Sequence, residues 1–198
     1  MKKIITILFF VFVSTASFAN ENFYVGVEIS DNEVDTGVSA VSGATLDEDD
    51  TGYAIIAGFK LNDNFDIEFG YRDFGEASLK GDSGDTFTLD GTDYVFTASA
   101  TIKAESDAFF LGVKPKFNLS DNVHAFGRFG FHSWDTKFNV STATASADVN
   151  EDGIDPYYGV GLSAKIANGF VIEGSYSTYE TNEDITSLSG FAGYKFTY

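Results

Sequence analysis

The sequence has 198 residues, with 12 lysine and arginine residues against 30 aspartate and glutamate residues, and its formal net charge is −18. A chain this acidic excludes nucleic acid as a partner, because phosphate backbones are bound by basic surfaces. The absence of cysteine excludes disulfide bonds and thiolate chemistry.

The beginning of the chain predicts a signal peptide that is cleaved on export. Lys2 and Lys3 form a basic start, residues 4–13 are apolar, and Ser17-Phe18-Ala19 provides small residues around a cleavage site. About ten apolar residues are too few for a membrane-spanning helix, which needs roughly 20. We therefore assign residues 1–19 to a signal peptide and residues 20–198 to one mature domain.

The alternation of apolar and polar side chains along the mature domain predicts eight β-strands. They cover residues 22–30, 52–61 and 65–75, a strand ending at 117, a strand beginning at 123, and residues 156–166, 170–180 and 185–198. No segment is apolar over the length of a membrane helix, and only helices and closed barrels satisfy their backbone hydrogen bonds in lipid. A soluble β-sandwich also alternates, so the connections must distinguish the two folds.

Short and long connections alternate along the chain. The turns at residues 62–64, 118–122 and 167–169 are short and rich in turn-forming residues, whereas the connections at 31–51, 76–106 and 135–155 are long and polar. Outer membrane barrels place short turns in the periplasm and long loops outside the cell. The predicted fold is therefore all-β, an eight-stranded antiparallel up-and-down transmembrane β-barrel with short periplasmic turns and long extracellular loops.

Several segments carry a resemblance to known barrels. They are Gly58-Phe59-Lys60-Leu61-Asn62-Asp63-Asn64-Phe65, Glu68-Phe69-Gly70-Tyr71-Arg72-Asp73-Phe74-Gly75, Asp155-Pro156-Tyr157-Tyr158-Gly159-Val160-Gly161-Leu162 and Gly193-Tyr194-Lys195-Phe196-Thr197-Tyr198. With them the chain resembles the eight-stranded family of the OmpA transmembrane domain, OmpX and opacity-type surface proteins. The resemblance implies a monomer in the outer membrane of a Gram-negative bacterium, in contact with lipid and lipopolysaccharide.

The aromatic carboxyl-terminal end resembles an assembly signal. Tyr194, Phe196 and Tyr198 alternate in the way that the outer-membrane assembly machinery reads in this family, although family members usually end in Phe and this chain ends in Tyr. The resemblance therefore implies the assembly machinery as a partner.

Charged residues share the glycine-bearing face of the predicted strands. They are Glu28, Asp66, Glu68, Arg72, Lys114, Arg128, Lys165 and Glu173. The lumen of an eight-stranded barrel is just wide enough for side chains, and ions buried there must pair. We expect a structural network of salt bridges in the lumen. The alternative is a proton or ion path that opens when a pair breaks.

One segment is a weak candidate for calcium. Residues 148–153 match the first half of an EF-hand loop, with Asp148, Asn150 and Asp152 as oxygen ligands, but Gly159 stands where the bidentate glutamate belongs. We predict no other metal site and no cofactor, apart from divalent cations that bridge the acidic loops to lipopolysaccharide.

The outer connections carry most of the negative charge, with 21 of the 30 acidic residues. Residues 86–96 predict a hairpin around Asp90-Gly91, which allows the strands to continue above the membrane as a protruding sheet. An exposed edge of such a sheet either recruits a partner by strand addition or only stiffens the loops.

Catalysis is not predicted. His132 and Ser133 are adjacent on a strand and so point to opposite faces, and the chain has two histidines and no convincing triad. We expect a non-enzymatic protein that supports envelope integrity or surface interaction with an unknown extracellular partner. A narrow channel gated by lumenal salt bridges is the first alternative, and a lipid-modifying enzyme is the second.

Overall fold

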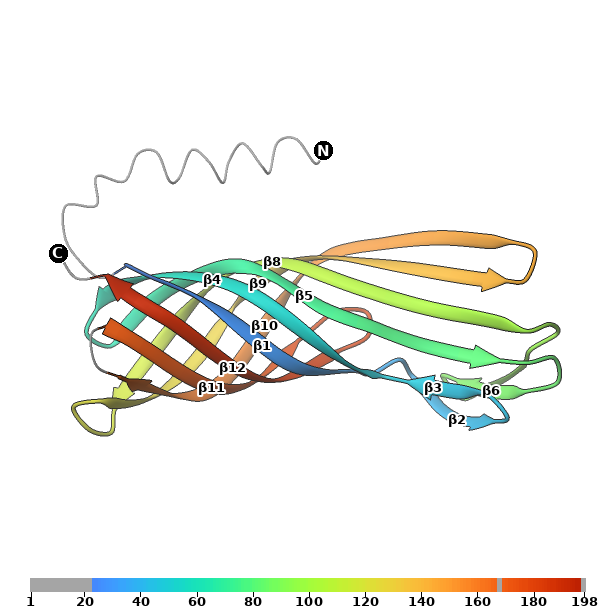
Figure 1. The fold of residues 1–198 in the computed structure, drawn as a ribbon, viewed down its shortest axis with the longest axis horizontal. Coiled ribbons are helices and arrows are strands. Elements are labelled where there is room, and N and C mark those ends of the chain that lie inside the picture. The colour runs from blue at the N-terminus through green and yellow to red at the C-terminus, as the bar shows by residue number, and fades with distance from the viewer. Residues whose placement is uncertain (1–22, 167–168, 197–198) are drawn as a thin grey trace.

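A computed structural model describes residues 23–166 and 169–196, and eight of its β-strands form one closed antiparallel barrel (Figure 1). The barrel strands are β1 Phe23–Val34, β4 Asp49–Asn62, β5 Phe65–Gly81, β8 Ala100–Asn118, β9 Val123–Thr142, β10 Ser146–Lys165, β11 Phe170–Tyr179 and β12 Ile185–Phe196. Pairing of β5 with β8 and of β12 with β1 closes the ring. The predicted eight-stranded barrel is confirmed, whereas the predicted signal peptide lies outside the described residues.

The short turns lie at one end of the barrel, which we call the periplasmic end because barrels of this kind place short turns there. At the opposite end four strands continue well beyond the barrel, as the long green and orange ribbons of Figure 1 show. Pairing of β8 with β9 extends to Ala100 opposite Thr142, and pairing of β9 with β10 extends to Ser141 opposite Ser146. Much of the long connections at 76–106 and 135–155 is therefore paired strand, and the strands continue above the membrane as the protruding sheet that the sequence allowed.

A small second sheet completes what we call the outer extension, residues 35–51, 75–106 and 135–156. Its strands are β2 Val38–Ser42, β6 Thr86–Leu89 and β7 Thr92–Val95. The predicted hairpin around Asp90 and Gly91 is confirmed, since both residues have positive φ, 49° and 76°, as a type I′ turn requires. The sequence analysis did not predict β2, nor β3 Thr45–Asp47, which pairs with the outer part of β5.

The barrel wall is apolar outside and polar inside. Ile29, Phe131 and Val160 are 64%, 64% and 66% exposed on the outer face, although each is a large hydrophobic side chain. Glu28 and Arg72, by contrast, are 1% exposed inside. This arrangement is the reverse of a soluble protein and suits a wall that faces lipid. Within the described ranges, no helix has the length and hydropathy to cross a membrane.

Aromatic rings form a belt on the outer wall near the periplasmic end. The ring of Phe23 lies 5.2 Å from that of Phe59 and 5.9 Å from that of Phe196. Tyr194 in turn contacts Phe196 and Phe170, at 4.9 and 5.2 Å between ring centroids. Such belts anchor membrane proteins at the level of the lipid headgroups.

We expect Gly112→Ala to destabilise the barrel by about 1–3 kcal/mol, because an overpacked site must move backbone or side chains. A Cβ at Gly112 would lie 2.3 Å from the Tyr157 hydroxyl and 2.7 Å from the Phe129 carbonyl oxygen. The midpoint of urea unfolding, followed by fluorescence of the single tryptophan, measures the effect. Gly190→Ala is the control, since nothing lies within 4 Å of its Cβ. Equal midpoints for the two variants would contradict the described packing.

Candidate functional site

A layer of ion pairs crosses the middle of the lumen. Its members are Glu28 on β1, Glu68 and Arg72 on β5, Lys114 on β8, Arg128 on β9 and Glu173 on β11. Each lies on the inward face because side chains of a strand alternate between the two faces. The side chains are between 1% and 5% exposed. Three carboxylates meet three cations, so the layer is neutral as a whole.

Arg128 holds the layer together, because its guanidinium contacts all three carboxylates. Nη1 lies 2.9 Å from Glu28, Nε lies 2.8 Å from Glu68, and Nη2 lies 3.0 Å from Glu173. Arg72 provides Glu28 with a second partner. Lys114 binds Glu68 and Glu173 at 3.0 and 2.6 Å. Each carboxylate therefore has two cationic partners, as buried ions require.

Six of the eight charged residues named from the sequence thus meet in this layer, and two do not. Asp66 lies closer to the periplasmic end and pairs with Lys116 at 2.5 Å. Lys165 forms no ion pair with any described residue. Lys116 was not among the charged residues named from the sequence, although it lies two residues after Lys114 on the inward face of the same strand.

Aromatic side chains fill the lumen on the extracellular side of the ion pairs. They are Phe74, Phe110, His132, Trp134, Tyr157 and Tyr179. The rings of Tyr157 and Tyr179 stack at 5.3 Å, and the Arg72 guanidinium lies 5.0 Å from the Tyr179 ring centre. The ion-pair layer and the aromatic layer together close the lumen.

The two members of the candidate catalytic pair face opposite sides of the wall. His132 lies in the lumen, 1% exposed, and its Nε2 donates a hydrogen bond to the carbonyl oxygen of Glu180 at 2.8 Å. Ser133 is exposed on the outer face of β9. The imidazole therefore does not reach the neighbouring hydroxyl.

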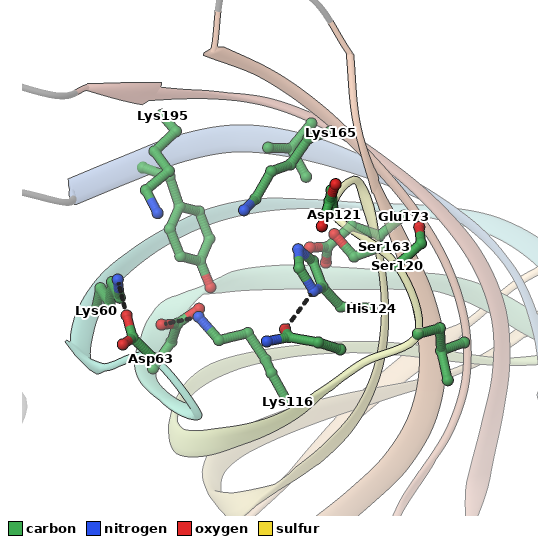
Figure 2. Close-up of a pocket in the computed structure, with 15 residues that line it drawn as sticks. Lys60, Asp63, Lys116, Ser120, Asp121, His124, Ser163, Lys165, Glu173 and Lys195 are labelled. Carbon is green, nitrogen blue, oxygen red and sulfur yellow. Dashed lines mark hydrogen bonds and ion pairs between the residues drawn. The ribbon is translucent and has the colours of Figure 1, made fainter.

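A cavity of about 510 Å³ opens at the periplasmic mouth of the lumen (Figure 2). Its wall carries four lysines, Lys60, Lys116, Lys165 and Lys195. Asp63 lies in the turn after β4, where the hydrogen bond from Lys60 lowers the pKa of this carboxyl. Glu173 of the ion-pair layer lies at the inner end of the cavity.

The outer extension contains an open strand edge. From Tyr157 inwards β10 pairs with both β9 and β11, and the Pro156 carbonyl oxygen accepts a hydrogen bond from the Glu180 backbone N–H, but residues 146–155 pair only with β9. This edge carries Asp148, Glu151 and Asp152. Burial and the nearby carboxylate of Glu151 raise the pKa of Glu183, which lies in the connection between β11 and β12. Negative charges are thus crowded beside the open edge.

The calcium candidate does not form the loop that an EF-hand requires. Asp148, Asn150 and Asp152 belong to strand β10, in register with Asn139, Lys137 and Asp135 of β9. Alternate residues of a strand are roughly 7 Å apart, too far for their side chains to encircle one ion as a loop does. Among the described residues, no three His, Asp or Glu side chains gather as a metal site.

The predicted assembly signal falls partly on described residues. Tyr194 and Phe196 lie in the aromatic belt near the periplasmic end, whereas Tyr198 lies outside the described residues.

Comparison with known proteins places the chain among outer membrane barrels. The family model of the OmpA-like transmembrane domain matches residues 18–179. A crystal structure of Ail, the attachment invasion locus protein of Yersinia pestis, with the heparin analogue sucrose octasulfate has a TM-score of 0.56 at 15% identity, covering 89% of this chain and 99% of Ail. The outer membrane protein OprG of Pseudomonas aeruginosa has a TM-score of 0.54 at 13% identity, covering 90% and 97%. No curated protein matches the sequence significantly.

We expect Arg128→Met to lower the free energy of unfolding by about 3–5 kcal/mol, because it leaves three carboxylates facing two cations in the lumen. Urea unfolding of the refolded protein measures this loss. Lys103→Met is the matched control, since it removes the cation of a partly exposed pair with Glu76 in the outer extension. Equal free energies of unfolding for the Arg128→Met and Lys103→Met variants would refute the central role of Arg128.

Proposed function

Because the chain belongs to the OmpA-like transmembrane domain family and forms an outer membrane β-barrel, we propose that it acts without catalysis, supporting the envelope and binding a partner through its outer extension. The observation that carries the proposal is the open edge of β10, where residues 146–155 have a strand neighbour on one side only. An extended peptide binds such an edge through main-chain hydrogen bonds.

Charge indicates the chemistry of the partner. The outer connections carry 21 acidic residues and three basic ones, Lys80, Lys103 and Lys137. A surface of one sign attracts the opposite sign and slows the approach of the same sign. Ail was crystallised with a heparin analogue, a polyanion. The acidic extension of this chain favours instead a basic, extended segment of another protein.

The lipid-facing wall and the belt complete the proposal. The barrel is a monomer surrounded by outer membrane lipid and lipopolysaccharide. The assembly machinery inserts it after recognising the end that includes Tyr194 and Phe196. Acidic loops lying close to lipopolysaccharide would require divalent cations between them, since both carry negative charge.

A variant with a shortened β9–β10 hairpin tests whether the open edge of β10 binds the partner. In this variant Asn-Gly replaces residues 136–151, which joins Asp135 to Asp152 at the point where these residues face each other. The variant exposes residues 100–106 of β8 as a new edge, but this segment has one lysine and one glutamate and therefore lacks the negative charge of the β10 edge. We expect the shortened protein to fold and to lose binding of an alternating lysine-valine decapeptide, measured by biolayer interferometry on protein in nanodiscs. Heat-modified gel mobility reports the folding.

A matched variant distinguishes the contribution of the negative charges from that of the open backbone edge of β10. Asp148→Asn with Glu151→Gln and Asp152→Asn keeps the hairpin and removes three negative charges. We expect it to bind the peptide at least tenfold more weakly and with a smaller dependence on salt, because screening acts on exposed charges. A wild-type protein that binds heparin fragments and ignores the peptide would contradict the proposal.

A narrow channel is the second candidate. The observation in its favour is that the periplasmic cavity already reaches Glu173, so the ion-pair and aromatic layers are the remaining barrier to passage. Each layer is closely packed, and opening would require buried ion pairs to separate.

Planar bilayer recordings distinguish the two candidates. We expect the wild-type protein to show no unitary conductance at neutral pH, because neutral packed layers leave no continuous water path. Discrete openings of wild-type protein, altered in size or frequency by Glu173→Gln, would establish the channel instead.

A further inference from the structure

The periplasmic cavity combines two features that the proposed function does not use, two lysines that form no ion pair with the described residues and a polar floor. Its four lysines come from four different strands, Lys60 from β4, Lys116 from β8, Lys165 from β10 and Lys195 from β12. Figure 2 shows Lys165 and Lys195 reaching into the cavity from one side and Lys116 facing them from the other. Four separate strands thus direct cations into one space.

Two of these lysines have carboxylate partners and two do not. Lys60 binds Asp63 at 2.5 Å, and Lys116 binds Asp66 at 2.5 Å. Among the described residues, neither Lys165 nor Lys195 forms an ion pair.

The other two carboxylates of the cavity, Glu173 and Asp121, do not form ion pairs with Lys165 or Lys195. Glu173 is held by Lys114 and Arg128 of the ion-pair layer, and Asp121 lies in the exposed turn before β9. No described carboxylate therefore forms an ion pair with the ammonium group of Lys165 or of Lys195.

The floor of the cavity offers polar groups that suit an anion. The hydroxyl-bearing Ser163 lines it and is 6% exposed. His124 is 9% exposed, and its Nδ1 is 2.7 Å from the side-chain oxygen of Asn118, which fixes the plane of the imidazole ring. The volume of about 510 Å³ admits a small molecule.

We propose that this mouth binds a phosphate group between Lys165 and Lys195. A phosphate monoester carries about −1.5 to −2 charge at neutral pH, with three acceptor oxygens, and so matches two ammonium groups that form no ion pair with described residues. The phosphodiester of a phospholipid headgroup carries one negative charge, which the two ammonium groups would share. Lysine binds phosphate as a point charge and does not require the planar geometry of a guanidinium. The phosphate belongs either to a small solute of the periplasm or to the headgroup of a phospholipid in the inner leaflet.

Phosphorus NMR of the full-length protein, refolded in maltoside micelles that contain no phosphorus, tests the proposal. One arm adds inorganic phosphate, and the other adds phosphatidylglycerol to the micelles. We expect saturable broadening of the phosphorus signal, with affinity at least tenfold weaker for Lys165→Gln with Lys195→Gln. The control is Lys80→Gln with Lys137→Gln, which removes the same charge from the outer extension and should bind as the wild type does.

The two arms separate the sources of phosphate. Saturation by inorganic phosphate supports a soluble ligand, and saturation by phosphatidylglycerol alone supports the headgroup. Absence of saturable binding in both arms overturns the proposal, and so does an equal response of the two double variants. Heat-modified gel mobility confirms folding of each variant, so that a loss of binding cannot come from a loss of the barrel.

Discussion

An eight-stranded barrel encloses a lumen that side chains fill, so little water can hydrate the ions inside it. These ions must instead be stabilised by pairing with ions of opposite charge. Arg128 satisfies this requirement by contacting all three buried glutamates, and Arg72 and Lys114 complete the neutral layer. These residues come from five of the eight strands, so the layer also fixes the relative heights of strands far apart in the sequence. The aromatic layer packs directly on it through Arg72 and Tyr179. Strand register, lumen closure and the floor of the periplasmic cavity all depend on this one set of ion pairs.

The basic residues are distributed unevenly along the barrel axis. Beyond the predicted signal peptide there are ten, of which three lie in the lumen layer, four at the periplasmic mouth and three in the outer connections. The outer connections hold 21 of the 30 acidic residues. The outer end is therefore strongly acidic, whereas the periplasmic mouth has as many lysines as carboxylates and includes two lysines that form no ion pair with described residues. Ligands of opposite sign can be bound at the two ends without competing.

Period-two alternation predicted the strands and the six residues of the ion-pair layer, because one face of each strand meets lipid and the other meets the lumen. The alternation of short and long connections was also needed to predict a barrel instead of a sandwich. Lys116 was not named as an inward charge although it falls within the predicted strand that ends at 117, and it continues the inward face as the partner of Asp66. Above the membrane both faces of a strand meet water and the alternation fades, so the sequence allowed a protruding sheet but did not predict where β9 ends or where β10 begins. The pairing of β2 with β6 joins distant segments and leaves no local signal in the sequence.

The open edge of β10 arises from unequal hairpins. β10 begins at Ser146, but its neighbour β11 ends at Tyr179, opposite Tyr157, and the connection to β12 is too short to cover the remaining backbone. An exposed edge invites pairing with a second copy of the same strand. Asp148, Glu151 and Asp152 oppose this, because two copies would bring like charges together. The same charges leave the edge available to a strand of opposite sign, so the feature that discourages self-association also selects the class of partner.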